Sequence, residues 1–116
     1  MTRHAAWRRA RRRPDQPDFA AVNRAALAVL PALLRRWLPD GRIERNEYVA
    51  LNPLRSDRRL GSFSINLRTG CWADFAIDGA RGGDPISLAA YLRGIRQVEA
   101  AVRLASMLGI KTHDVR

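Results

Sequence analysis

Residues 61–86 read GSFSINLRTGCWADFAIDGARGGDPI, and the rest of this 116-residue chain is organised around them. Phe63, Ile65 and Leu67 alternate with polar residues, which is the period-two pattern of a half-buried β-strand. Arg68–Gly70 has the composition of a tight turn, and a second short strand follows it. The stretch therefore predicts a β-hairpin.

A three-residue loop gives this hairpin its most consistent side-chain pattern, because a two-residue loop would mix apolar and polar residues on both faces. The three-residue loop predicts an apolar face made by Leu67 with Cys71, Ile65 with Ala73 and Phe63 with Phe75. The opposite face then carries Ser64, Asn66, Trp72 and Asp74. A large aromatic such as Trp72 on a polar face is either covered by another element or offered to a flat ligand.

The charge of the chain indicates an anionic partner. The 21 Lys and Arg residues outnumber the 11 Asp and Glu residues, and the net charge is +10 with a pI near 11.5. Nucleic acid is the usual partner of such a surface. A GC-rich genome also favours arginine, since Lys111 is the only lysine, but it explains the excess over acids less well.

Other features of the composition exclude several classes of protein. The lone Cys71 excludes an intramolecular disulfide and a cysteine-based zinc site. The chain contains no run of 18 or more apolar residues, so no membrane-spanning helix is predicted. The N-terminus lacks the apolar region of a secretory signal. We therefore expect a cytoplasmic protein without a membrane partner.

We expect one domain, at residues 18–110, between a basic arm and a short tail. The arm, residues 1–17, carries six arginines and one acid, and we expect it to be flexible. It either grips phosphates or only keeps the chain soluble. The tail covers residues 111–116.

The first half of the domain predicts two helices and one or two strands. Asp18 is suited to cap a helix that starts at Phe19, and Pro31 to begin a second helix that ends at Leu38. Their apolar stripes form either core or a partner-binding face. Residues 43–51 predict either one long strand or a strand pair, the latter with a turn at Arg45–Glu47 between residues 42–44 and 48–51.

The second half predicts a glycine-rich turn and two helices. The glycines at 79–83 do not form a phosphate-binding loop, because no Gly-Lys-Ser or Gly-Lys-Thr follows. Asp84 instead caps a helix that begins at Pro85 and ends before Gly94. A last helix spans 97–108. The predicted fold class is α+β, a small antiparallel sheet flanked by N-terminal helices and two C-terminal helices.

The loop at residues 54–60 is polar and basic. It carries Arg55, Arg58 and Arg59 around Asp57, and such a loop between strands is a common place for phosphate contacts. The alternative is that these arginines are solvated, with one of them paired to Asp57.

Over residues 48–110 the chain resembles the N-terminal zinc-ribbon domain of bacterial and phage DNA primases. The matching features, in order, are Pro53, Ser62-Phe63-Ser64-Ile65, Gly70, Trp72, Gly82-Gly83-Asp84 and Ile86-Ser87-Leu88. The resemblance implies a zinc-ribbon-like fold and a role in engaging single-stranded template, without the polymerase chemistry.

The chain departs from that family at the four positions of the zinc ligands. These positions correspond to Asn52, Arg55, Asp74 and Ala76 or Ile77, and an arginine cannot ligate zinc. We expect a zinc-less fold with no metal and no cofactor. Its stability would come from an apolar core that includes Phe63, Ile65, Leu67, Phe75, Leu88, Leu92, Val98 and Leu108.

Two functions are consistent with these features, and neither is catalytic, since no acidic triad and no nucleophile paired with a base is visible. The first is a single-stranded DNA-binding module of a primase or replication system, encoded by a phage or another mobile element. The second is an adaptor that docks onto a separately encoded primase, polymerase or helicase, in which the basic charge has no role in binding. A remnant of a larger protein, with its function lost, is a third possibility. In the first, bases stack on Trp72 and Tyr48 while phosphates bind Arg55, Arg58, Arg59, Arg68 and Arg81. Exposure of Trp72 favours the first function and burial the second.

Overall fold

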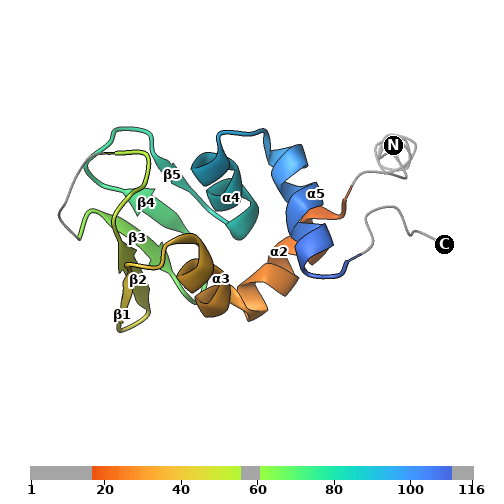
Figure 1. The fold of residues 1–116 in the computed structure, drawn as a ribbon, viewed down its shortest axis with the longest axis horizontal. Coiled ribbons are helices and arrows are strands. Elements are labelled where there is room, and N and C mark those ends of the chain that lie inside the picture. Colours follow the sequence, from red (N-terminus) through yellow and green to blue (C-terminus); the bar gives the residue numbers. More distant parts are fainter. Residues whose placement is uncertain (1–16, 56–60, 111–116) are drawn as a thin grey trace, which may run out of the picture.

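The computed structural model describes residues 17–55 and 61–110, and within them the chain has an α+β fold (Figure 1). The predicted arm up to residue 16, the tail, and Arg58 and Arg59 lie outside the described residues. In chain order the elements are α2 (Phe19–Ala28), α3 (Leu30–Trp37), β1 (Arg42–Glu44), β2 (Glu47–Ala50), β3 (Phe63–Asn66), β4 (Trp72–Asp74), β5 (Arg81–Gly82), α4 (Pro85–Arg93) and α5 (Gln97–Met107).

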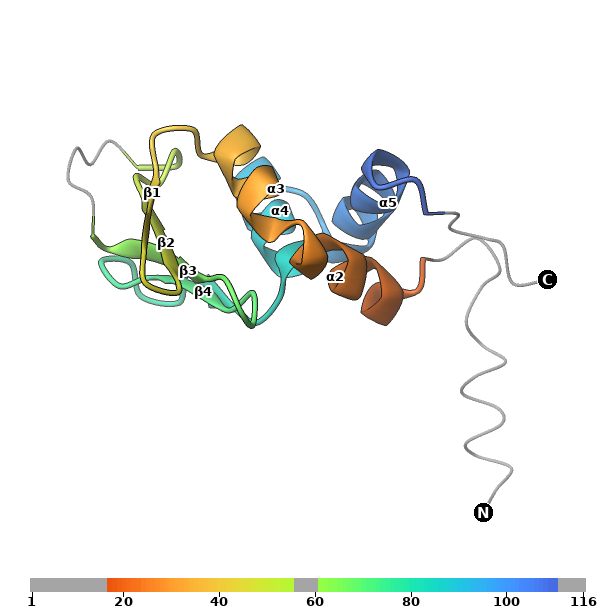
Figure 2. The same ribbon diagram turned by 90° about the horizontal axis from the view of Figure 1, so that it is seen from below.

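The five strands form one antiparallel sheet in the order of the chain, β1 to β5. Figures 1 and 2 both place α3 and α4 between the sheet and the pair α2 and α5. The helices α3 and α4 thus cover one face of the sheet, and α2 and α5 lie on the side of these helices away from the sheet. The predicted α+β class is confirmed. No helix among residues 17–55 and 61–110 is long and apolar enough to cross a membrane.

Two apolar clusters hold these layers together. The first joins the sheet to α3 and α4, and consists of Leu30, Leu34, Leu38, Tyr48, Ala50, Phe63, Ile65, Trp72 and Leu88. The second joins the helices, and consists of Val22, Ala26, Leu33, Ile86, Ala89, Ala90, Ala100, Ala101, Leu104 and Ala105. Trp37 packs against both clusters, so the sheet and the helical half share a continuous interior.

Most predicted helix ends are confirmed by their hydrogen bonds. The Asp18 carboxylate accepts the Ala21 N–H at 3.2 Å. The Asp84 carboxylate accepts the Ser87 N–H at 2.8 Å in a reciprocal capping box, with Pro85 as the first helical residue. Gly94 ends α4 in the left-handed region at φ 67°, where a side chain would be strained.

The predicted register of the β3–β4 hairpin is wrong by one residue. Ile65 pairs with Trp72 and Phe63 with Asp74, which leaves the four residues 67–70 in the loop rather than three. Because side chains alternate along a strand, this shift moves Trp72 and Asp74 to the helix-covered face, with Phe63 and Ile65. Ala73, predicted on the apolar face, points to the opposite face with Ser64.

Asn66 explains the longer loop. Its side-chain oxygen accepts the N–H groups of Arg68 at 2.8 Å and Thr69 at 3.0 Å, and its carbonyl accepts the Gly70 N–H at 2.8 Å. This arrangement satisfies the backbone donors of the turn from inside the loop. Gly70 has φ 80°, so the predicted glycine conformation is confirmed in a different turn.

Two further expectations differ from the structure. Phe75 does not belong to the core; it is 79% exposed, the highest value given for any large apolar side chain among the described residues. The glycine-rich segment also contains the short strand β5, whose Arg81 pairs with Ala73 of β4. The register shift accounts for Phe75, because it moves this side chain to the face away from the helices.

Candidate nucleic-acid interface

Trp72 is part of the core and is not a surface for base stacking. It is 5% exposed. The centroid of its ring lies 4.8 Å from the ring centroid of Tyr91 and 6.3 Å from that of Phe63. Its indole N–H donates to the Ser87 hydroxyl at 2.9 Å. A Cβ on Gly82 would lie 2.5 Å from the indole nitrogen, so the ring lies directly against the β5 backbone. The predicted stacking role of Trp72 is therefore wrong.

Tyr48 is equally unavailable. It is 1% exposed, and its hydroxyl donates to the Leu38 carbonyl at 2.7 Å, which ties β2 to the end of α3. Burial raises the pKa of this hydroxyl. A Cβ on Gly41 would lie 2.3 Å from the ring, so this glycine gives the ring its space. Tyr48 stabilises the fold, and the predicted stacking on it is also wrong.

Asp74 lies at the centre of a buried polar corner at the end of β4. Both of its carboxylate oxygens accept a hydrogen bond from Arg55 at 3.0 Å, and Asn52 donates to one of them at 2.9 Å. The Asn52 amide also donates to the Tyr91 hydroxyl at 2.9 Å. The Asp74 side chain is fully buried and that of Arg55 is 22% exposed. Arg55 thus forms a mostly buried ion pair with Asp74, and its predicted contact with phosphate stays a prediction.

The carboxylate of this corner stays ionised because its neighbours stabilise the charge. Burial alone would raise the pKa of Asp74. The opposing hydrogen bonds come from Asn52, the Ala76 N–H, Arg55 and Ser62. They outweigh burial and hold the pKa of Asp74 below its usual value. The corner therefore contains an ion pair whose charges are both satisfied.

The positions assigned to metal ligands by the resemblance meet in this corner. The side chains of Asn52, Arg55 and Asp74 are in contact, and the Ala76 N–H donates to Asp74 at 3.0 Å. Elsewhere in the described ranges too, no three His, Cys, Asp or Glu side chains come together. The segments that carry these positions are joined here by an ion pair and amide hydrogen bonds.

Phe75 projects from the same corner into solvent. Its N–H donates to the Ser62 carbonyl at 2.8 Å, which extends the β3–β4 ladder by one pair beyond Asp74. Alternation along the strand places its side chain on the face away from the helices, in agreement with its 79% exposure. The backbone is held on both sides, since Asp74 is buried before it and the Ala76 N–H is bonded after it. Phe75 is thus an exposed aromatic on a well-fixed backbone.

The four remaining predicted arginines are not gathered into one site. Arg81 is exposed and pairs with Ala73, which places it on the same face as Phe75. Arg68 is exposed in the β3–β4 loop, at the opposite end of that hairpin. Arg58 and Arg59 lie in the segment 56–60, outside the described residues. Arg55, which precedes this segment, donates to the Ser62 hydroxyl at 3.3 Å.

The described surface is more basic than its composition alone suggests. Residues 17–55 and 61–110 contain eleven arginines and eight acids, and every one of these arginines except Arg55 is exposed. Four acids are engaged within the fold: Asp18 and Asp84 cap helices, Asp74 binds Arg55, and Glu47 accepts hydrogen bonds from Ser64 and Asn66. Fewer carboxylates than arginines are therefore presented to a ligand.

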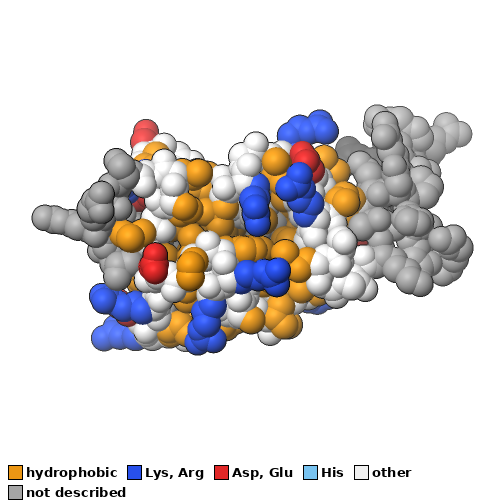
Figure 3. Space-filling view, viewed as in Figure 1, with side chains coloured by type: hydrophobic (Ala, Val, Ile, Leu, Met, Phe, Trp, Pro, Cys, Tyr) orange, Lys and Arg blue, Asp and Glu red, His pale blue; other side chains and the backbone are white. Residues whose placement is uncertain are grey.

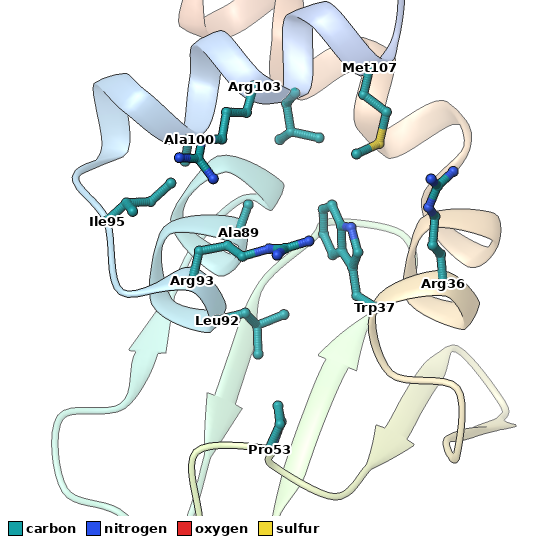
Figure 4. Close-up of a pocket in the computed structure, with 11 residues that line it drawn as sticks. Arg36, Trp37, Pro53, Ala89, Leu92, Arg93, Ile95, Ala100, Arg103 and Met107 are labelled. Atoms are coloured by element: carbon teal, nitrogen blue, oxygen red, sulfur yellow. The ribbon is translucent and has the colours of Figure 1, made fainter.

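A second surface feature is a groove of about 490 Å³ between α3, α4 and α5. Figure 3 shows basic side chains around an apolar strip on this face, and Figure 4 shows the lining. Arg93 of α4 points toward Trp37 of α3, while Arg36 and Arg103 extend from the neighbouring helices (Figure 4). Phe75 was expected in the core, and the apolar stripe of residues 31–38 was expected to form either core or a partner-binding face, so neither an exposed Phe75 nor a groove with α4 and α5 was predicted. The sequence signal that could have indicated the groove is the adjacent pair Arg36 and Trp37 in one short helix.

Comparison with known proteins identified no family model and no curated protein that matches this chain.

Proposed function

We propose that this chain is a non-catalytic single-stranded nucleic-acid binding module of a replication system, and that Phe75 is its stacking residue. The observation that carries the proposal is an aromatic side chain that is 79% exposed on a backbone fixed by the Asp74 corner. A base that stacks on an exposed phenyl ring removes apolar surface from water, which favours binding.

The arginines supply the second part of the proposed mechanism. Arg81 lies on the same sheet face as Phe75. Arg58 and Arg59 lie outside the described residues, and their phosphate contacts are proposed from the basic composition of the loop alone. Phosphates would bind these three arginines while a base stacks on Phe75, and Arg68 and the arm would add contacts without sequence preference. DNA of a phage or another mobile element, bound in the cytoplasm, is the proposed substrate.

The resemblance to primase zinc ribbons gains support from the corner. Four positions from two segments that are 19 or more residues apart meet at one point, as ligand positions in that family would have to. In this chain the corner would join the segments without a metal. We propose that the module acts beside a separately encoded primase, polymerase or helicase.

Anisotropy with a labelled oligo-dT strand and a matched duplex tests the proposal, at about 50 and 200 mM salt. Phe75→Ala should weaken single-strand binding by about five- to a hundredfold, and Phe75→Tyr by much less, because stacking needs only the ring. Phe19→Ala is the matched control, since Phe19 is also a partly exposed phenylalanine, on α2. Equal binding of strand and duplex, unchanged in Phe75→Ala, would reject the stacking function.

The adaptor function is a second candidate, which the burial of Trp72 favours. Its distinguishing requirement is an apolar docking surface, and the groove between α3, α4 and α5 meets it.

A further inference from the structure

The groove between α3, α4 and α5 has a mainly aliphatic lining. Besides Trp37, its apolar side chains include Pro53, Leu92, Ile95, Leu104 and Met107. Met107 is 44% exposed, and Ile95 and Leu92 are half-buried, so an occupant would remove apolar surface from water. An aliphatic groove between helices is the surface into which an amphipathic helix lays its apolar face.

The charged side chains that line the groove are all basic. Three arginines line its rim (Arg36, Arg93 and Arg103), and no acid does. Arg103 shares an exposed ion pair with Glu99 at 3.0 Å, and its guanidinium retains donors for another carboxylate. Acidic side chains on the flanks of an occupant would complement this rim.

We propose that this groove docks an amphipathic helix of another protein, with apolar residues on its inner face and Glu or Asp along both flanks. The proposal gives the adaptor candidate its surface and the chemistry of its partner. It does not rest on the nucleic-acid function, because neither Phe75 nor Arg81 lines the groove.

Other occupants fit the groove less well. A second copy of the chain, or its own N-terminal arm with six arginines, would bring positive charge to a positive rim in a chain of net charge +10. The arginines could bind the phosphates of a nucleic-acid single strand, but the lining residues include only one aromatic side chain on which a base could stack. An acidic amphipathic helix satisfies both the lining and the rim.

Two display libraries of helical peptides about 18 residues long test the proposal with the full chain as bait. One face is randomised among Leu, Ile, Met and Phe in both libraries, while the flanks are Glu in one and Lys in the other. We expect enrichment from the Glu library alone. No enrichment from it, or equal enrichment from both, would overturn the proposal.

The enriched peptide is then measured against groove variants by anisotropy. Met107→Glu, which places a carboxylate at the apolar lining, and the double variant Arg36→Glu/Arg93→Glu should each weaken binding by about tenfold or more. The matched control Arg24→Glu/Arg45→Glu makes the same charge change at exposed positions that do not line the groove, and should change affinity by less than about threefold. Circular dichroism of each variant checks the fold.

Four further results would contradict this proposal. Peptide binding that is equal in wild type, the groove variants and the control would place the peptide outside the groove. Loss of oligo-dT binding in Met107→Glu with retention in Phe75→Ala would make the groove the nucleic-acid site. A concentration-dependent dimer in sedimentation that Met107→Glu dissociates would make the occupant a second copy. An intact Phe75-dependent oligo-dT interaction alongside a failed peptide selection would reject this proposal alone.

Discussion

Trp72 and Phe75 lie three residues apart in one strand and its extension, yet one is core and the other is almost fully exposed. Trp72 packs between the sheet and α4 on Tyr91 and Phe63, whereas Phe75 projects from the opposite face. A single residue of register separates this arrangement from the reverse one. The difference shows that the position of a candidate stacking residue depends on the loop that sets the register.

The two regions are also stabilised differently, which predicts a large effect at Trp72. Trp72→Ala removes a buried indole and its hydrogen bond to Ser87, and should lower the free energy of unfolding by about 3–5 kcal/mol. Urea denaturation followed by circular dichroism measures it. Val102→Ala, at a partly exposed position on α5, is the control and should cost under about 1 kcal/mol. A Trp72→Ala variant as stable as wild type would contradict the burial of Trp72.

The corner that supports Phe75 depends on a paired charge rather than on apolar packing. Asp74→Ala leaves Arg55 without its buried carboxylate and should cost about 3 kcal/mol of unfolding free energy. Asp78→Ala removes an exposed aspartate from the next turn and should cost under about 0.5 kcal/mol. Equal stabilities of the two variants would show that the ion pair does not hold the corner.

Acid should weaken the corner through the same carboxylate. The pKa of Asp74 is lower in the folded than in the unfolded chain, so its stabilisation is complete above the unfolded pKa and is lost as pH falls through the folded one. Wild type should therefore lose stability from about pH 4 downward, while Asp74→Asn, less stable at neutral pH, should lose less over that range. Parallel pH profiles of the two proteins would contradict the lowered pKa.

The smallest effect on stability should be at Phe75 itself. Phe75→Ala removes few packing contacts, because the side chain is 79% exposed, and unfolding free energy should change by under about 0.5 kcal/mol. The same urea experiment as for Trp72→Ala measures it. A loss above about 2 kcal/mol would show that Phe75 packs against the fold in solution.

The sequence predicted the elements with local signals and missed those set by tertiary structure. Asp18, Asp84 and Gly94 act within one turn of a helix, so their roles could be predicted from neighbouring residues. The register depends on Asn66, whose side chain organises a longer loop while its position in the strand suggested only alternation. The two-residue strand β5 has no periodic signal that could be recognised.

The candidate site was predicted less well than the fold, for the same reason. Trp72 and Tyr48 were chosen as aromatics near basic residues, but the space that buries each is made by Gly82 and Gly41, at a distance in sequence. The ion pair of Arg55 with Asp74 joins residues 19 positions apart. Arg81 is exposed, as expected, because it lies in the short edge strand β5 on the sheet face away from α3 and α4.

Photocrosslinking tests most directly whether Phe75 is the stacking residue. A 5-bromouracil-substituted single strand, irradiated with the full chain and followed by mass spectrometry of the peptides, reports which aromatic lies against the base. We predict a crosslink at Phe75 that disappears in Phe75→Ala. A crosslink at Trp37 in the groove instead, or a yield unchanged in Phe75→Ala, would contradict the proposal.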